Sequence, residues 1–256
     1  MIRLVASDID GTLIPYKCQK ISDEFFEAAL QLIESGVPFC FASGRQYDNL
    51  RRLAGPLLDK AYYMCENGAV VFAAGEKREL VAKTPMGWDD ALRVADRILA
   101  DPEYEVFISG ENITYICPKT YAAEDLARNG LCNNVAVIPS PKDTPEPILK
   151  VSAWCRNSAE AYPKLAWGWE DKFTVAIAGK NWVDFTLGNK GSGLRALCAH
   201  LGVELADVAA FGDNYNDLPM LDIVGHPYIM NSAAPELLAR FENHCGNVAE
   251  ELRKLL

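Results

Sequence analysis

The sequence of 256 residues predicts an α/β protein, in which a core built on a parallel sheet is interrupted by a separate α+β segment. Two observations support this fold class. Short apolar runs alternate with helical patterns at both ends of the chain, whereas hairpin signals dominate its middle. Because strand–helix alternation produces right-handed parallel units, we expect a ligand crevice at the carboxyl ends of the strands.

The first elements follow this alternation. The run from Ile2 to Ala6 is short and apolar, as expected of a strand buried on both faces of a sheet. A helix comes next, because Ser22 can cap it, apolar residues recur at helical spacing, and Gly36 can end it. A second strand is predicted at 37–42. A helical stretch that ends near Leu58 and a third apolar run at 61–65 follow.

The middle of the chain has a different character. Turn signals at Asn67-Gly68, Gly110-Glu111-Asn112 and Gly179-Lys180 lie between strand-like runs and predict antiparallel pairing. After about Leu187 the strand–helix alternation resumes. Helical patterns at 88–100 and 122–129, and a proline-rich stretch at 139–147 that we expect to be exposed, complete the inserted part. We therefore assign 1–83 and 188–256 to a discontinuous core domain and 84–187 to an inserted α+β domain.

Composition narrows the class of protein. With 35 acidic against 25 basic residues, the formal charge is −10, so the overall field repels nucleic acid and anionic membranes. No signal-peptide pattern opens the chain and no apolar run could span a bilayer, so we expect a cytoplasmic protein without membrane or nucleic-acid partners. The eight cysteines form no CxxC pair, which argues against zinc-ribbon and redox motifs and favours reduced, buried thiols.

Two carboxylates stand directly after the first predicted strand, in Asp8-Ile9-Asp10-Gly11-Thr12. A carboxylate that attacks a phosphate ester must overcome the repulsion between two anions, and a bridging divalent cation removes this obstacle. Magnesium suits a site whose ligands are all oxygen atoms. The second acid can protonate the leaving alkoxide and then deprotonate the water that opens an aspartyl-phosphate.

A simpler interpretation is that Asp8 and Asp10 only cap a turn, as the pattern Asp-x-Asp-Gly often does. On these residues alone, the two interpretations stay open. A calcium-binding EF-hand is excluded, because the glycine comes too early and the twelfth position is not glutamate.

Three further segments at strand ends are compatible with phosphate. Ser43-Gly44 offers a hydroxyl and a backbone amide at the start of a helix, although a simple N-cap is the alternative. Asn189-Lys190-Gly191-Ser192-Gly193 offers an ammonium ahead of a helix predicted at 194–201, against the alternative of a solvated lysine. Gly212-Asp213-Asn214-Tyr215-Asn216-Asp217 offers carboxylates that could complete a magnesium shell with Asp8, against the alternative of an acidic loop.

In their order and approximate spacing, these segments resemble the four motifs of haloacid dehalogenase (HAD)-type phosphatases. Two further features, Glu66-Asn67-Gly68-Ala69 and the tail Ile229-Met230-Asn231-Ser232-Ala233, resemble the Cof-type subfamily, HAD hydrolase subfamily IIB. The position of the insertion also matches that subfamily. The resemblance extends over essentially the whole chain and is weakest in the insertion.

The resemblance implies a Rossmann-like core with a mobile α+β cap that closes over the site. It implies that Asp8 is the nucleophile and Asp10 the general acid/base. Magnesium would be held by the Asp8 carboxylate, the Asp10 backbone carbonyl and Asp213, while Asp217 would support Lys190 or the metal shell. The implied phosphate ligands are Thr12, Ser43, Gly44, Lys190 and Asn216. The expected activity is magnesium-dependent hydrolysis of a small phosphorylated metabolite.

Other functions remain to be weighed. Gly191-Ser192-Gly193-Leu194-Arg195-Ala196 fits a dinucleotide-binding fingerprint, but an NAD(P)-dependent oxidoreductase would leave Asp8, Asp10, Ser43 and Asp213 without a task. No Walker motif for a kinase occurs. A phosphomutase would share the aspartyl-phosphate, and only the Cof-type resemblance favours hydrolysis. Sugar phosphates are the first expected substrates, then flavin mononucleotide or pyridoxal phosphate, and we expect a monomer or a small homo-oligomer.

Overall fold

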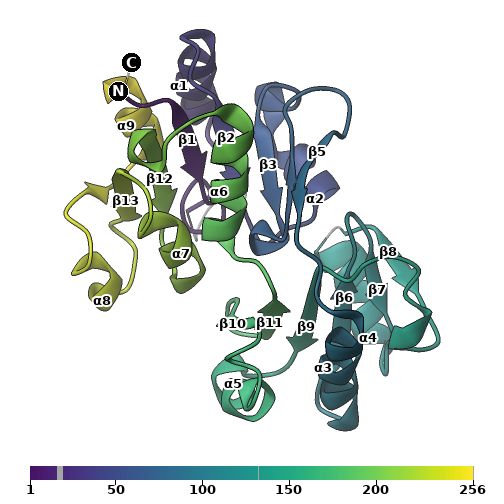
Figure 1. Ribbon diagram of the computed structural model, residues 1–256. Coiled ribbons are helices and arrows are strands. Elements are labelled where there is room, and N and C mark those ends of the chain that lie inside the picture. Colours follow the sequence, from purple (N-terminus) through teal and green to yellow (C-terminus); the bar gives the residue numbers. More distant parts are fainter. Residues whose placement is uncertain (16–19, 132, 256) are drawn as a thin grey trace. The chain divides into compact units, whose positions relative to one another are not determined.

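The computed structural model describes residues 1–15, 20–131 and 133–255, and the chain forms two compact units (Figure 1). We call the first the core unit and the second the inserted unit. The core unit contains Met1–Arg45, Leu50–Ala82 and Asn189–Leu256, and the inserted unit contains Gln46–Asn49 and Lys83–Gly188. The predicted α/β fold class is confirmed, because parallel strands alternate with helices in the core unit.

The core sheet has eight described strands in the order β14-β13-β12-β1-β2-β3-β4-β5. The neighbours from β14 to β3 pair in parallel, whereas β3 and β4 are antiparallel. The strand β1 therefore lies inside the sheet, as its apolar sequence predicts. The bounds are β1 (Leu4–Ser7), β2 (Phe39–Ala42), β3 (Tyr62–Cys65), β4 (Val70–Phe72), β5 (Leu80–Lys83), β12 (Val208–Gly212), β13 (His226–Met230) and β14 (His244–Cys245).

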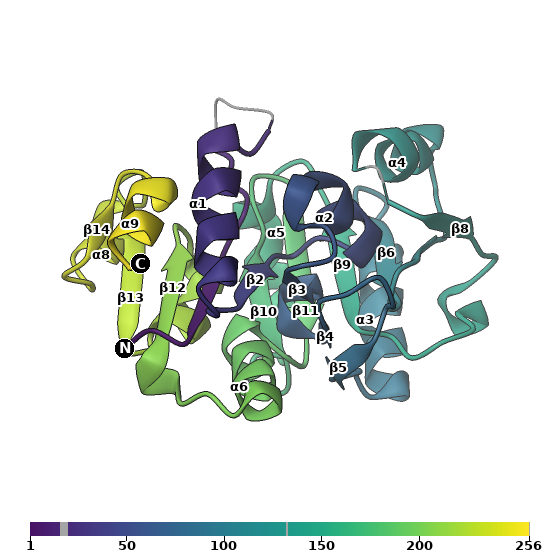
Figure 2. The same cartoon turned by 90° about the horizontal axis from the view of Figure 1, so that it is seen from above.

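Helices cover both faces of this sheet. Figure 2 shows α1 (Asp23–Glu34) and α9 (Val248–Lys254) on one side and α6 (Lys190–Leu201) on the other. The side chains of β1 alternate accordingly, so that Leu4 and Ala6 belong to the hydrophobic cluster that includes residues of α6. The core unit also contains α7 (Leu218–Leu221) and α8 (Pro235–Leu238), whereas α2 (Tyr47–Leu53) begins in residues of the inserted unit and ends in residues of the core unit.

The start of α1 is where the sequence places it, since Ser22 accepts a hydrogen bond from the amide of Phe25 at 3.2 Å. Two other helix bounds differ from the prediction. The helix expected to reach Leu58 ends at Leu53, because Gly55-Pro56 forms a 3₁₀ turn instead. The last predicted helix begins at Lys190 rather than residue 194, because Asn189 and Ser192 cap it reciprocally.

The turn at Asn67-Gly68 joins β3 to β4 within the core sheet. Antiparallel pairing, which was predicted for the inserted segment, therefore also occurs at one edge of the core sheet. The turn lies beside Ser43 and Gly44, which are predicted to bind phosphate.

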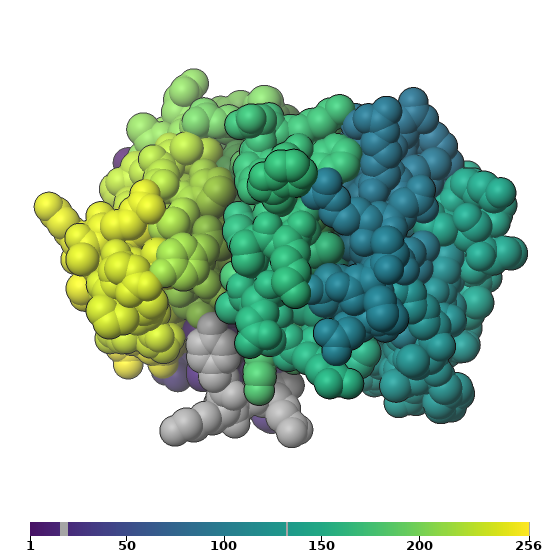
Figure 3. All heavy atoms as spheres, turned by 90° about the horizontal axis from the view of Figure 1, so that it is seen from below, coloured from purple at the N-terminus to yellow at the C-terminus, as the bar shows by residue number. Residues whose placement is uncertain are grey.

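The inserted unit contains a mostly antiparallel sheet with six described strands in the order β10-β11-β9-β6-β7-β8. The helix α3 packs on one face, and Figure 3 shows its blue surface beside the green segment that contains α5. Hydrogen bonds from Arg97 to the carbonyls of Leu165 and Trp167 join these two segments. The bounds are β6 (Glu105–Ser109), β7 (Thr114–Ile116), β8 (Val135–Val137), β9 (Lys150–Trp154), β10 (Thr174–Ile177), β11 (Trp182–Thr186), α3 (Trp88–Ala100), α4 (Tyr121–Asp125) and α5 (Ser158–Ala166).

The proline-rich stretch is only partly exposed, because Pro141 and Thr144 are buried while Pro145 and Pro147 are exposed. The six cysteines in the described part of the chain are free thiols, and all but Cys117 are buried. Cys18 and Cys132 lie outside the described residues. Among the helices that the structure describes, none combines the length and the apolar character that crossing a bilayer requires.

Candidate active site

Three of the predicted site residues follow neighbouring strands of the core sheet. Asp8 comes after β1, Ser43 after β2 and Asp213 after β12, and the order β12-β1-β2 places these strand ends side by side. The amide of Asp8 donates to the carbonyl of Phe211 at 2.9 Å. This bond continues the pairing of β1 with β12, so Asp8 and Asp213 follow two strand ends in fixed register. The parallel sheet thus brings together residues that lie more than two hundred positions apart in the sequence.

The carboxylate of Asp8 is buried, with 5% of the residue exposed. Its Oδ1 accepts a hydrogen bond from Lys190 Nζ at 2.6 Å, whereas its Oδ2 is buried without a hydrogen-bond partner. Burial raises the pKa of Asp8 well above its usual range; Lys190 opposes this rise, and the carboxylates of Asp217 and Asp213 add to it. A buried carboxylate with one unsatisfied oxygen calls for a further ligand.

Lys190 is completely buried at the first residue of α6, so the prediction of a lysine ahead of the helix needs correction by one turn. Its Nζ lies 2.6 Å from Asp8 Oδ1 and 2.6 Å from Asp217 Oδ1. Burial lowers the pKa of Lys190, but the two carboxylates raise it by more, so the ammonium stays protonated. The alternative of a solvated lysine is wrong.

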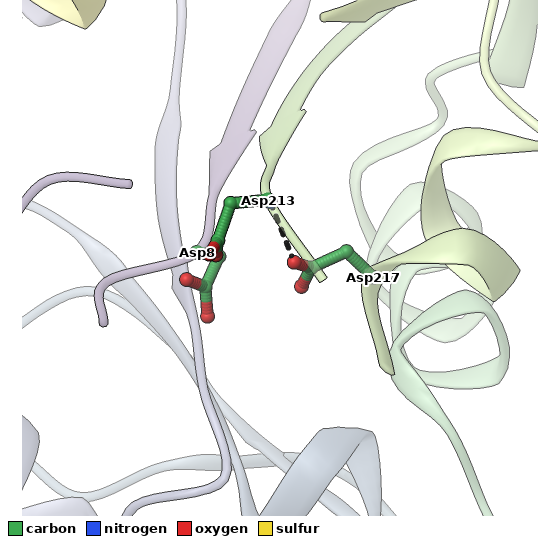
Figure 4. Close-up of side chains that lie close together, drawn as sticks. All are labelled: Asp8, Asp213 and Asp217. Atoms are coloured by element: carbon green, nitrogen blue, oxygen red, sulfur yellow. Dashed lines mark hydrogen bonds between the residues drawn. The ribbon is translucent and has the colours of Figure 1, made fainter. Parts of the chain in front are cut away.

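Asp217 holds the lysine and the neighbouring backbone at once. Its Oδ2 accepts hydrogen bonds from the amides of Asp213 at 2.9 Å and Asn214 at 3.0 Å. Figure 4 shows the first of these bonds as a dashed line, with the side chains of Asp8 and Asp213 close together. Asp217 therefore supports Lys190, one of the two roles that the sequence left open for it.

The three aspartates offer carboxylate oxygens that all lie within 4.8 Å of one another. Against the three carboxylates, Lys190 supplies one positive charge, so the cluster carries excess negative charge when all three are ionised. Hard oxygen donors from Asp8 and Asp213, with Asp8 Oδ2 lacking a hydrogen bond, fit a magnesium ion. The residues present are thus suited to the predicted metal.

Gly11 leaves room for this cluster. Its φ is +99°, and a Cβ at this position would lie 2.2 Å from Asp213 Oδ2. Any side chain would push the Asp213 carboxylate away, so only glycine fits. The next residue, Thr12, is buried and donates from Oγ1 to Asp213 Oδ1 at 3.3 Å. The loop after β1 is therefore packed directly against Asp213.

Asp10 lies apart from the aspartate cluster. Its side chain is half exposed, and both of its oxygens accept hydrogen bonds from Arg45, at 2.7 Å from Nε and 2.6 Å from Nη2. Such two-point pairing fixes the orientation of both groups. Arg45 directly follows Ser43-Gly44 in the sequence, but no sequence pattern predicts its pairing with Asp10.

Apart from Lys190 at the start of α6, the predicted phosphate ligands lie in the segments that follow β1, β2 and β12 in the core unit. Ser43 is buried, and its Oγ accepts a hydrogen bond from the amide of Arg45 at 3.3 Å. Ser43 was predicted at the start of a helix, but α2 begins four residues later. Asn216 Nδ2 donates to Asn67 Oδ1 at 3.3 Å. The nearest atom to a Cβ built on Gly44 would also be Asn67 Oδ1, at 3.1 Å. Asn67 thus joins the candidate site, although its sequence pattern predicted only a turn and a family resemblance.

The glycines of the dinucleotide-like fingerprint serve a different purpose. A Cβ on Gly191 would lie 2.1 Å from the carbonyl oxygen of Pro219, and one on Gly193 would lie 2.9 Å from the Cα of Gly68. These glycines permit close packing of α6 within the protein. They do not line a free loop for a pyrophosphate.

Comparisons with known proteins find a matching family and similar folds. Residues 5–251 match the model of a family described as haloacid dehalogenase-like hydrolase. A solved structure of a protein from Eubacterium rectale is 27% identical, with 100% of this chain and 99% of that chain covered and a TM-score of 0.85. A haloacid dehalogenase-like hydrolase from B. subtilis is 19% identical, with both chains covered fully and a TM-score of 0.84. The HAD subclass IIB sugar phosphatase BT4131 is 18% identical, with 99% of this chain and 98% of that chain covered and a TM-score of 0.84.

Proposed function

The chain belongs to the haloacid dehalogenase-like hydrolase family, and from this premise we propose that it is a magnesium-dependent phosphatase acting on small phosphorylated metabolites. One observation carries the proposal. Asp8 is buried between Lys190 and two further carboxylates, and one of its oxygens has no hydrogen-bond partner. A carboxylate placed in this way is oriented by the lysine and needs a cation, as a nucleophile towards phosphate does.

In the first step, an Asp8 oxygen attacks phosphorus, and the bond between phosphorus and the ester oxygen breaks. Lys190 holds Asp8 in position at 2.6 Å and offers positive charge to the phosphoryl oxygens. The leaving alkoxide takes a proton from Asp10. The products of this step are the alcohol and an aspartyl-phosphate on Asp8.

In the second step, Asp10 accepts a proton from water as the water oxygen attacks phosphorus. The bond between Asp8 and phosphorus breaks, which releases inorganic phosphate and restores the Asp8 carboxylate. Because Arg45 holds both oxygens of Asp10, this pair has to open or turn so that Asp10 can carry the proton that it gives up in the first step and takes in the second. Arg45 thus holds the Asp10 side chain in place until the proton is transferred.

Magnesium, when bound, would be held by Asp8, Asp213 and the Asp10 backbone carbonyl, and it would lower the repulsion between Asp8 and the phosphate dianion. Thr12, Ser43, Gly44, Lys190 and Asn216 would bind the phosphoryl oxygens. Asp217 would keep Lys190 oriented through the 2.6 Å ion pair, and its second oxygen is already occupied by two amides. We therefore expect Asp217 to affect the metal only through its neighbours.

Sugar phosphates are the proposed substrate class. The fold is shared with the sugar phosphatase BT4131, and the predicted Cof-type features point in the same direction. On this proposal, residues 84–187 form the cap domain. A cytoplasmic location and a monomeric or small oligomeric state remain predictions.

A phosphate-release screen over metabolite phosphates with magnesium tests the proposal. We expect wild-type protein to hydrolyse at least one sugar phosphate and Asp8→Asn to release none above background. Equal release by both proteins would end the claim that Asp8 is the nucleophile. Transfer of the phosphoryl group to a second sugar, with no free phosphate, would support the phosphomutase instead.

A further inference from the structure

The turn Glu66-Asn67-Gly68 between β3 and β4 has an unusual backbone. Glu66 has a φ of +51° and Asn67 a φ of +56°, and these are the described non-glycine residues with positive φ. Left-handed conformations are costly for residues with a side chain, and they persist where the surrounding structure requires them. Asparagine often adopts this conformation in hairpin turns, whereas glutamate rarely does, so the contacts around the turn have to hold Glu66 in it.

The turn is bound to the loop that contains Ser43 and Gly44. The amide of Asn67 donates to the carbonyl of Ser43 at 3.0 Å, and the amide of Glu66 donates to the carbonyl of Arg45 at 3.1 Å. A Cβ on Gly44 would lie 3.1 Å from Asn67 Oδ1, so the Asn67 side chain lies directly against that glycine. These hydrogen bonds connect the turn to the loop after β2.

The same turn touches two other segments of the candidate site. Asn67, with 7% of the residue exposed, accepts a hydrogen bond from Asn216 Nδ2 at 3.3 Å. Gly68 lies against the start of α6, since a Cβ there would be 2.3 Å from the carbonyl oxygen of Asn189 and 3.0 Å from the Cα of Lys190. One short turn therefore contacts the loop after β2, the lysine helix and the loop after β12.

We propose that Asn67 is a positioning residue for the phosphoryl group, which sets the relative placement of the Gly44 amide and Asn216. This inference rests on the proposed phosphatase function. Asparagine suits the position because it tolerates the left-handed backbone and carries a neutral amide. An aspartate would accept from Asn216 equally well, but its negative charge would repel a phosphate bound by the same loops.

Asn67→Gly and Asn67→Asp separate this role from that of a simple turn. Glycine adopts the left-handed conformation without strain, so Asn67→Gly should keep or raise the midpoint of thermal unfolding. We expect KM for a sugar phosphate and Ki for inorganic phosphate to rise about tenfold, the loss typical of one hydrogen bond near a charged group. Asn67→Asp should raise both constants further, and magnesium affinity should change little in Asn67→Gly.

Gly75→Ala is the matched control. Gly75 lies in the core unit at a φ of +125° with no atom within 4 Å of an added Cβ, so alanine adds strain without touching the site. We expect a lower unfolding midpoint and an unchanged Ki for phosphate. This control shows that lost stability alone does not weaken phosphate binding.

Three results decide the inference. Unchanged constants in Asn67→Gly, beside an active wild-type enzyme, overturn the positioning role and leave the phosphatase proposal intact. A lower unfolding midpoint in Asn67→Gly together with unchanged Ki shows a purely structural turn and also overturns it. A wild-type protein that neither releases nor binds phosphate overturns the proposed function and this inference with it.

Discussion

Two buried carboxylates, one in each unit, show what distinguishes a candidate catalytic acid from a structural one. Asp8 in the core unit and Glu105 in the inserted unit each have 5% of their surface exposed. Both oxygens of Glu105 are satisfied, by the amide of Lys119 at 2.9 Å and by the hydroxyl of Thr120 at 2.9 Å. Asp8 has a lysine on one oxygen and no hydrogen bond on the other.

The difference lies in what surrounds each carboxylate. Glu105 ties β6 to Thr120, the N-cap residue of α4, and its hydrogen bonds are complete within the protein. Asp8 faces two further carboxylates at the end of a parallel strand, and burial without a full set of partners is costly. Burial of an acid alone therefore does not indicate function, whereas an unsatisfied oxygen among like charges does.

Asp8→Asn should have the largest effect. The amide cannot form an acyl phosphate, so we expect phosphate release to fall by at least about 10³-fold, as when other enzymes lose their nucleophile. The substitution also removes charge from a crowded acidic cluster, so stability should be kept or raised. Initial rates of phosphate release and thermal unfolding, measured on the same preparations, test both statements. Residual activity within tenfold of wild type would contradict the assignment.

Lys190→Met should come next. The methionine fills a similar volume but leaves Asp8 and Asp217 without their shared cation at 2.6 Å. We expect kcat to fall by about 10²–10³-fold, the loss seen when one preorganised charge-stabilising group is removed from an active site. Arg240→Gln is the control, because it breaks an exposed arginine–aspartate pair of the core unit at 2.8 Å that involves no predicted site residue. Its kcat should stay at the wild-type value.

Removal of the metal should abolish activity reversibly. Treatment with a chelator is expected to stop phosphate release, and added magnesium should restore it. Asp213→Asn should raise the magnesium concentration needed for half-maximal rate by about tenfold or more, because it removes one charged ligand from the cluster. Full activity after exhaustive chelation would exclude a magnesium-dependent mechanism.

Arg45→Gln should have a smaller effect that depends on the substrate. The arginine orients both oxygens of Asp10, and the general acid matters most when the leaving group is a poor one. We expect kcat for a sugar phosphate to fall by about tenfold, and kcat for p-nitrophenyl phosphate by much less. Asp10→Asn should show the same pattern with a larger loss. An equal loss on both substrates would show that Arg45 does not act through Asp10.

Glu105→Gln should have the smallest effect on catalysis. The glutamine side chain keeps one acceptor oxygen, but its NH₂ group then faces either the backbone amide of Lys119 or the hydroxyl of Thr120, so one of the two present hydrogen bonds is lost. We expect the free energy of unfolding to fall by about 1–2 kcal/mol. The kcat for p-nitrophenyl phosphate should not change. A large loss of kcat with intact stability would show that Glu105 contributes to catalysis and is not a purely structural carboxylate.

Much of the core could be predicted from local patterns. The short apolar runs before Asp8 and Asp213 correspond to β1 and β12, because strands buried on both faces of a parallel sheet have few polar residues. The topology of such sheets then places the ends of neighbouring strands at one edge. The start of α6 was predicted four residues too late, because glycine disfavours helices and Gly191 and Gly193 lie in the first turn. Asn189 and Ser192 nevertheless stand at the spacing of a capping pair.

Other features depend on contacts that local patterns do not reveal. The pairing of Arg45 with Asp10 joins residues 35 positions apart, and nothing in either segment predicts it. The assignment of Gln46–Asn49 to the inserted unit depends on hydrogen bonds such as the one from Gln46 to Thr114 at 2.6 Å. The left-handed backbone at Glu66 was equally hidden, because glutamate rarely adopts it.

The central claim is that Asp8 forms a covalent bond to phosphorus during turnover. Acid quenching of the enzyme in the first turnovers, followed by mass spectrometry of its peptides, measures this directly. We expect the peptide that contains Asp8 to gain one phosphoryl group, and the gain to disappear when the substrate is exhausted. Phosphate release without this adduct, or an adduct on a different residue, would contradict the account.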